Sequence, residues 1–282
     1  MDPRRAPPWG GERTHAIEEL LREKGQFVCR QGLGDRALFK KMGAISSRVY
    51  DAVVLAPVID AVCGCEGFAA RRREIFAKAK GRVLDVGVGS GHNLPWFSGN
   101  KVTEVVGVDT SEDLLRRARK RTEGLDFEVD LRVGDAHDLA EFQDESFDTV
   151  AVGFTLCSVR DPKACLLELR RVLKPGGFLL YAEHGEAPER DGSLRTWQRR
   201  VTPYWSALAG GCHLDRNPER LVRRAGFEVE EAKQEYVEGM KTRLGEWHGD
   251  RNRKSQTEDP LTCSHTIKAA FVYTGVATRA GA

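Results

Sequence analysis

The chain has 282 residues, with 44 Lys and Arg against 42 Asp and Glu, so its formal net charge is +2. An apolar fraction of 40% is too large for a disordered chain. The near-balance of charge argues against a dedicated nucleic-acid binder, which concentrates a basic excess. A chain of this length can bury a proper core as one large domain or two small ones.

The seven cysteines are odd in number and scattered along the chain. No CxxC pair occurs, so their spacing supports neither a zinc ribbon nor a thioredoxin-like site, and we expect no metal. We interpret the single close pair, Cys63 and Cys65, as incidental reduced thiols. Scattered, unpaired cysteines are typical of a reducing compartment. We also find neither a secretory signal nor an apolar run of about 20 residues, so we expect a soluble, cytoplasmic protein.

The first 80 residues divide into two parts. Residues 1–34 are rich in charge, Pro and Gly around one short helical pattern, and we expect a flexible or partly helical extension. Over residues 35–80 apolar side chains recur at spacings near three and four, which is typical of amphipathic helices. We expect these helices to cover the rest of a single domain that spans residues 35–282.

From Gly81 onward, short apolar runs alternate with amphipathic segments. Such alternation predicts an α/β fold with a parallel sheet covered by helices on both faces. Strands are expected at 82–86, 102–109, 128–133, 147–154, 178–183, 227–232 and 267–276, and helices at 112–121, 162–173 and 218–225. An aromatic segment follows Trp197, and the polar residues 242–264 are expected to form an exposed loop.

The first of these strands runs into a glycine-rich turn, Asp85-Val86-Gly87-Val88-Gly89-Ser90-Gly91. Glycine at every second position lets the backbone turn tightly and approach a ligand. The dinucleotide fingerprint GxGxxG would need glycine where His92 stands. A helix starting near His92 would direct free amide groups at the ligand. The acid before the glycines suits a cationic ligand better than a pyrophosphate, which points to S-adenosylmethionine.

Two more carboxylates end the following strands. Asp109 lies 24 positions after Asp85, close to the offset of about 20 expected for a carboxylate that binds ribose hydroxyls. Asp135 can accept from the amine of adenine. The alternatives are that Asp109 caps the next helix and that Asp135 is a turn residue. Their order at successive strand ends favours a cofactor site.

Four segments together resemble the class I S-adenosylmethionine-dependent methyltransferases: residues 83–91, 134–136, 147–150 and 171–177. The resemblance covers roughly residues 80–240. It implies a Rossmann-like seven-stranded, mostly parallel sheet whose last hairpin contains the only antiparallel strand. It assigns cofactor binding to 81–184, with the acceptor side in 185–282. The cofactor-binding residues that it implies are Asp85, Gly87, Gly89, Gly91, Asp109, Thr110, Asp135, Ala136 and Thr155, with Tyr50 as part of a lid.

A narrower resemblance is carried by residues 154–159, 183–185, 197–198, 202–205 and 210–214. These segments look like bacterial small-molecule methyltransferases and the animal alkyl-thiol S-methyltransferases, the methyltransferase-like seven group. The animal members carry an N-terminal membrane-associating segment that we do not find here, and the 242–264 insertion departs from their pattern. Peripheral membrane contact and the acceptor therefore stay open, as does the oligomeric state.

Methyl transfer is mainly a task of positioning a nucleophile and excluding water. A thiol, with a reference pKa near 8.5, needs little help to ionise, whereas a hydroxyl or carbon acceptor needs a general base. The candidates after the fourth and fifth strands are Cys157, Ser158, Glu183 and His184. His184 is a candidate base or a structural histidine, and Cys157 a wall of the site rather than a nucleophile.

An apolar acceptor pocket is the expected role of the aromatic segment. The candidates are Trp197, Tyr204, Trp205 and His213, with ordinary core packing as the alternative. We expect methylation of a small molecule, with a thiol as the best single acceptor. Carbon or oxygen methylation of a quinone-like or lipid substrate, or a non-catalytic cofactor-binding subunit, are the alternatives. Nucleic-acid methylation is disfavoured, because the fourth strand ends in Phe154-Thr155-Leu156-Cys157 rather than Asn/Asp-Pro-Pro-aromatic.

Overall fold

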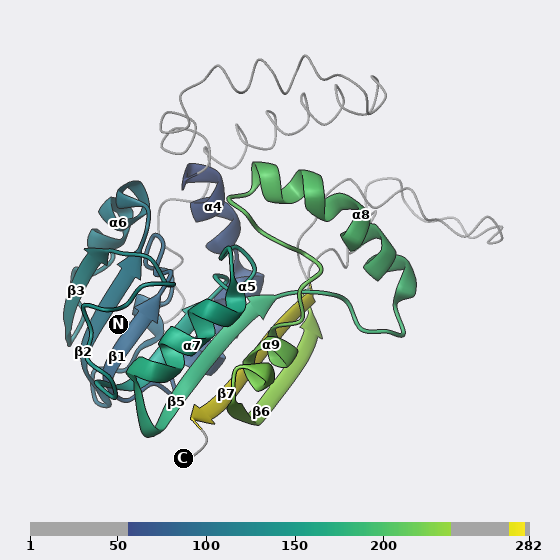
Figure 1. The fold of residues 1–282 in the computed structure, drawn as a ribbon. Helices are drawn as coiled ribbons and strands as arrows, with labels where there is room; N and C mark the ends of the chain where they lie inside the picture. Colours follow the sequence, from purple (N-terminus) through teal and green to yellow (C-terminus); the bar gives the residue numbers. More distant parts are fainter. Residues whose placement is uncertain (1–55, 238–270, 280–282) are drawn as a thin grey trace, which may run out of the picture. The chain divides into compact units, whose positions relative to one another are not determined.

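A computed structural model of the chain describes residues 56–237 and 271–279 (Figure 1). Its centre is a seven-stranded sheet in the order β3-β2-β1-β4-β5-β7-β6. The strands are β1 (Gly81–Val86), β2 (Val102–Asp109), β3 (Glu128–Val133), β4 (Phe147–Gly153), β5 (Leu173–His184), β6 (Phe227–Tyr236) and β7 (Phe271–Arg279). β7 pairs antiparallel with β5 and β6, and the pairs among β1 to β5 are parallel. This confirms the predicted Rossmann-like, mostly parallel sheet.

Helices cover both faces of this sheet (Figure 1). The helices are α4 (Ala56–Cys63), α5 (Glu66–Phe76), α6 (Glu112–Arg119), α7 (Pro162–Val172), α8 (Gly192–Leu208) and α9 (Pro218–Arg224), with the 3₁₀ turn η2 (Leu94–Trp96). Those that pack against the strands are α5, α6, α7 and α9. The sequence explains where α6 and α7 begin. The side chains of Ser111 and Asp161 accept hydrogen bonds from backbone amides in the first turns of these two helices.

Neighbouring residues of β1 point to opposite faces, as the two-residue period of a strand requires. Leu84 packs in a core with Leu166 of α7, while Val83 packs in another with Phe76 of α5. Both side chains are fully buried. A parallel strand covered on both faces needs such a continuous apolar run. The carboxyl ends of β1, β2, β3, β4 and β5 therefore meet at one edge, where α/β folds place their ligands.

One local prediction was wrong. The expected helix near His92 is only the short turn η2, because the chain becomes extended at Phe97. The aromatic segment after Trp197 is part of the helix α8, whose start is capped by the Asp191 carboxylate accepting from Leu194 N.

The remaining boundaries shift by a few residues. β6 continues to Tyr236, past the expected end at 232, and β7 ends later than expected, at Arg279. The first part of the expected last strand, residues 267–270, lies outside the described residues. So do the N-terminal extension, Tyr50 and the loop expected at 242–264.

Candidate cofactor and acceptor site

The glycine-rich loop after β1 has the backbone shape that its sequence predicts. Gly87, Gly89 and Gly91 have φ values of 67°, 55° and 84°, which L side chains rarely adopt. A Cβ on Gly87 would lie 2.1 Å from Thr155 Oγ1, and one on Gly91 would lie 3.1 Å from Ala118 Cα. A Cβ on Gly89 would meet no atom closer than 3.9 Å. Packing thus requires glycine at the two ends of the loop, while open space lies beside its centre.

Asp85 ends β1 and is completely buried. Its Oδ1 accepts from Asn93 Nδ2 at 2.8 Å, and Asn93 Oδ1 accepts from the buried Arg72 Nε at 2.9 Å. Among the described residues, Asp85 Oδ2 has no hydrogen-bond partner. Burial raises the pKa of this carboxyl to about 7, against the opposing hydrogen bond from Asn93. A buried carboxylate oxygen without a partner fits a cationic group such as the ammonium of S-adenosylmethionine.

Asp109 ends β2 and braces the same loop. Its Oδ2 accepts from Gly89 N at 2.9 Å, and its Oδ1 accepts from Ser111 N at 2.8 Å. Burial raises the pKa of Asp109, against these two hydrogen bonds. Each carboxylate oxygen keeps a second lone pair, so the residue is able to accept from ribose hydroxyls as well. Thr110, the next predicted residue, is exposed.

Asp135 follows β3 and is committed to a local turn. Its Oδ1 accepts from His137 N at 2.9 Å and pairs with His137 Nδ1 at 2.5 Å. Since His137 Nε2 accepts from Asp161 N at 3.0 Å, the ring proton resides on Nδ1. The backbone and side-chain hydrogen bonds from His137 lower the pKa of Asp135. The neighbouring Ala136 is buried. Both of these hydrogen bonds use Oδ1 of Asp135, so its role in the turn is compatible with a role of the other oxygen, Oδ2, in cofactor binding.

Asp60 of α4 is a partner of the glycine loop that sequence reasoning missed. Its carboxylate accepts from Ser90 Oγ at 2.6 Å and pairs with His92 Nε2 at 2.9 Å and Arg121 at 3.0 Å. Burial alone would raise the pKa of Asp60, but the hydrogen bonds from His92 and Ser90 and the Arg121 charge hold it well below its usual range. No spacing signal links it to the loop, because 30 residues separate it from Ser90.

Glu183, near the end of β5, shapes the turn that follows β4. Its carboxylate accepts from the backbone amides of Thr155 at 2.7 Å, Leu156 at 2.9 Å and Cys157 at 3.4 Å. The turn opens with Phe154 at a φ of 57°. Burial raises the pKa of Glu183 to about 8. The fully buried Glu183 is therefore a structural partner of the backbone that presents Thr155 and Cys157.

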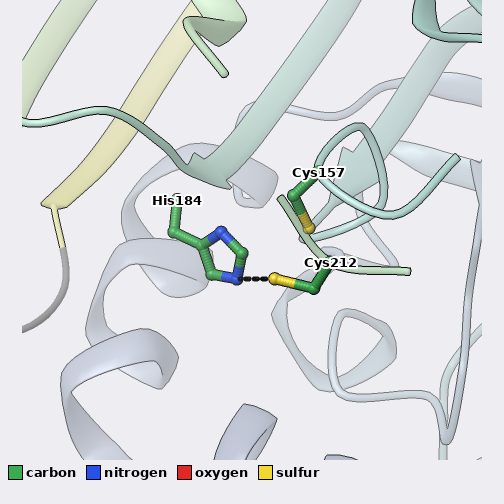
Figure 2. A group of neighbouring side chains, drawn as sticks. All are labelled: Cys157, His184 and Cys212. Atoms are coloured by element: carbon green, nitrogen blue, oxygen red, sulfur yellow. Dashed lines mark hydrogen bonds between the residues drawn. The ribbon is translucent and has the colours of Figure 1, made fainter. Parts of the chain in front are cut away.

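Beside this turn, Cys157, His184 and Cys212 point toward one another from three parts of the chain (Figure 2). Their ligand atoms lie within 4.8 Å of one another, and His184 Nε2 is 3.4 Å from Cys212 Sγ. Cys157 Sγ is also 3.3 Å from Ser158 Oγ. The structure thus brings all three predicted catalytic residues, Cys157, Ser158 and His184, together and adds Cys212.

The two thiols of this cluster are electrostatically different. The hydrogen bond with Cys212 and the nearby His184 hold the pKa of Cys157 well below its usual range, although burial opposes them. The same hydrogen bond raises the pKa of Cys212. Burial alone would lower the pKa of His184, but the Cys157 charge raises it to about 9. The hydrogen bond between them therefore favours the thiolate of Cys157 and the thiol of Cys212.

The predicted acceptor-side aromatics divide into two pairs. Trp205 Nε1 donates to Cys212 Sγ at 3.1 Å, and His213 N donates to Cys157 O at 2.8 Å, so both border the cluster. Trp197 and Tyr204 lie on the outer surface of α8 and are 41% and 53% exposed. Core packing therefore does not explain these two side chains.

Comparisons with known proteins agree with this geometry. A family model described as "Methyltransferase domain" matches residues 84–181. Thiol S-methyltransferase TMT1B of Rattus norvegicus is 32% identical over 166 residues, which cover 56% of this chain and 67% of that protein. Phosphatidylethanolamine N-methyltransferase of Cereibacter sphaeroides is 36% identical over 164 residues, covering 57% and 77%. Demethylmenaquinone methyltransferase of Clavibacter sepedonicus is 38% identical over 119 residues, covering 42% and 47%.

Solved structures show the same fold. A putative methyltransferase, solved in complex with the Haloferax volcanii Trm112 methyltransferase activator, superposes with a TM-score of 0.57 at 22% identity, covering 83% of this chain and 97% of that one. No helix within the described residues is long and apolar enough to cross a membrane. The family implies S-adenosylmethionine as the cofactor, and the unpartnered Asp85 oxygen and the open space at Gly89 fit it. This chain belongs to the class I S-adenosylmethionine-dependent methyltransferases and is an enzyme of that class.

Proposed function

We propose that this enzyme methylates a small-molecule thiol. The observation that carries the proposal is the hydrogen bonding of Glu183, whose carboxylate lies beside Cys157 of the cluster. The carboxylate oxygens of Glu183 already accept hydrogen bonds from three backbone amides. Glu183 is therefore poorly placed to act as the base that a hydroxyl or carbon acceptor needs. A thiol needs little such help. Relatives named thiol S-methyltransferases, at 31–33% identity, support the same assignment.

The cofactor would be held along the carboxyl edge of the sheet. Asp85 would pair with the ammonium, and the Gly87–Gly91 loop would let the backbone approach the ligand closely. Asp109 would accept from the ribose hydroxyls. Thr110, Asp135, Ala136 and Thr155 would complete the cofactor site. When bound, S-adenosylmethionine supplies a methyl group already activated by its sulfonium.

The acceptor would lie against the Cys157–His184–Cys212 cluster. Cys157 and Ser158 would line the site, and His184 would orient the acceptor or take up its proton. Trp205 and His213 border the cluster, so they would close the site, with Trp197 and Tyr204 extending an apolar cover along α8. We place all of this in one domain over residues 35–282, in a cytoplasmic protein.

The test is incubation of the full chain with S-adenosylmethionine carrying a labelled methyl group and a panel of acceptors. The panel contains alkyl and aryl thiols, phenols, quinols and phosphatidylethanolamine vesicles. We expect label in thioether products. Label in a phenol, quinol or lipid product with none in any thiol would overturn the thiol assignment.

Carbon, oxygen or nitrogen methylation of a quinone-like or lipid acceptor is the second candidate. It is favoured by the relatives that are named phosphatidylethanolamine N-methyltransferase and demethylmenaquinone methyltransferase. His184→Ala separates the candidates. A reaction that needs a base would be abolished at every pH, whereas thiol methylation would recover as the pH approaches the acceptor's own pKa.

A further inference from the structure

The Cys157–His184–Cys212 cluster combines two free thiols with an imidazole in a nearly closed site. Cys157 and Cys212 are 2% and 5% exposed, and neither is in a disulfide. The ligand atoms of the three residues lie within 4.8 Å of one another. In a tetrahedral zinc site, bonds of about 2.0–2.3 Å place neighbouring ligand atoms roughly 3.5 Å apart. The His184 Nε2 to Cys212 Sγ distance, 3.4 Å, already has that value.

The backbone that carries these ligands is held by hydrogen bonds from outside the cluster. Glu183 accepts from the amide of Cys157, and His213 N donates to Cys157 O, so the two cysteine-bearing segments are tied together. Trp205 Nε1 donates to Cys212 Sγ at 3.1 Å. Supporting contacts of this kind orient ligands and raise the affinity of a metal site.

His184 presents Nε2 to the thiols of the cluster, with Cys212 Sγ at 3.4 Å (Figure 2). A thiol is a weak hydrogen-bond donor and acceptor, so it is a weak partner for this nitrogen. A metal ion bound by the imidazole and the two thiolates would replace this weak contact with ligand bonds.

We propose that Cys157, Cys212 and His184 bind one zinc ion, and that its fourth position takes the acceptor thiol. Two thiolates and an imidazole are soft ligands, which favour zinc over hard cations such as magnesium or calcium. Three protein ligands with one open position are the pattern of a catalytic zinc site. The second half of this inference rests on the proposed thiol methylation.

The chemistry balances without a further reactant. Zinc binding displaces the thiol protons of Cys157 and Cys212 to solvent, and the acceptor thiol loses its own proton to solvent when it binds the metal. The acceptor sulfur then donates an electron pair to the methyl carbon. The bond from that carbon to the sulfonium breaks, and its electron pair stays on the sulfur of S-adenosylhomocysteine. The thioether is a weaker ligand than a thiolate and leaves the metal.

The cysteine spacing gave no reason to expect a metal, because such rules detect ligands that are close in sequence. Here 55 residues separate Cys157 from Cys212, and His184 comes from the strand β5 between them. The fold, and not a short motif, brings the three side chains together.

The first experiment measures metal binding without turnover. The full chain is stripped with a chelator and titrated with zinc against a chromophoric competitor, and its cobalt form is examined for thiolate-to-metal absorption. We expect one tight site per chain, weakened at least about a hundredfold by Cys157→Ser or Cys212→Ser. Cys65→Ser is the matched control, because the thiol of Cys65 makes no capping hydrogen bond at the start of α5. Circular dichroism of the metal-free variants checks that they fold.

Three results would overturn the metal site. They are equal zinc affinity in wild type and both cluster variants, a loss of affinity in Cys65→Ser instead, and a Cys157–Cys212 disulfide in the protein purified under reducing conditions.

The second experiment adds an alkyl thiol to the cobalt form. A shift of the absorption bands supports acceptor binding at the metal, and unchanged bands contradict it. Thiol methylation that continues at full rate in the metal-free enzyme would overturn the role of zinc in the reaction but would leave the proposed function standing. A tight zinc site in an enzyme that methylates no thiol would leave the metal site standing and overturn the proposed function.

Discussion

The proposed cofactor side and the proposed acceptor side lie at the same edge of one sheet but are built differently. The centre of the cofactor side is local, since Asp85, the glycine loop and Asn93 fall within nine consecutive residues. The acceptor side joins the turn after β4, the end of β5 and the segment after α8. The first depends on backbone shape, which residue spacing encodes. The second depends on topology, which spacing does not reveal.

The largest effect on the cofactor side is expected from Gly87→Ala. The new Cβ would lie 2.1 Å from Thr155 Oγ1 at a φ of 67°, so the loop must move. We expect the affinity for S-adenosylmethionine, measured by calorimetry, to fall at least about a hundredfold.

The control is Gly176→Ala, which has a similar φ of 71° but nothing within 4 Å of the new Cβ. Its cofactor affinity should equal that of wild type. Equal affinities in all three proteins would mean that the Gly87 contact does not shape the cofactor site.

On the acceptor side, Glu183→Ala should lower the free energy of unfolding by about 3 kcal/mol, because buried backbone amides lose their acceptor. Urea unfolding followed by circular dichroism measures this. Glu189→Ala is the control, since that side chain is 94% exposed, and it should be neutral. A Glu183→Ala variant as stable as the control would contradict the role we give to this carboxylate.

Asp109→Ala tests whether the carboxylate that braces Gly89 also serves the cofactor. Loss of charge-assisted hydrogen bonds costs about 1.5–3 kcal/mol, so affinity for S-adenosylmethionine should fall roughly tenfold to a hundredfold. Calorimetry measures the change, with the exposed Asp144→Ala as the control. Unchanged affinity in Asp109→Ala would remove it from the cofactor site.

The smallest effect is a pH dependence that Asp85 should impose on cofactor binding. Burial raises its pKa to about 7, so below that pH the free enzyme holds a proton that must leave before the carboxylate pairs with an ammonium. The dissociation constant should therefore rise about tenfold for each pH unit below 7, and rise again above about pH 8, where the α-amino group of the ligand loses its own proton. Asp85→Asn should weaken binding and abolish this slope. A dissociation constant of wild type that does not change with pH would contradict the pairing.

The contrast between the two sides also explains which features the sequence could predict. Strand order and the glycine loop follow from apolar periodicity and from glycines whose backbone angles exclude other residues. α8 was missed because we interpreted Trp197, Tyr204 and Trp205 as an aromatic segment of the acceptor pocket and assigned it no helix, and all three side chains are exposed. Asp60 and Cys212 were missed because their partners are distant in sequence, at Ser90 and His184.

Competition between a thiol and a hydroxyl within one acceptor is the sharpest test of thiol methylation. An acceptor that carries both a thiol and a hydroxyl, such as 4-mercaptophenol, is incubated with the enzyme and S-adenosylmethionine bearing a deuterated methyl group, and the product is identified by mass spectrometry and NMR. We expect the labelled methyl on sulfur, at a rate that Gly87→Ala reduces to the level without enzyme. A labelled methyl on oxygen, or no product from this acceptor while a lipid amine or quinol is methylated, would contradict thiol methylation.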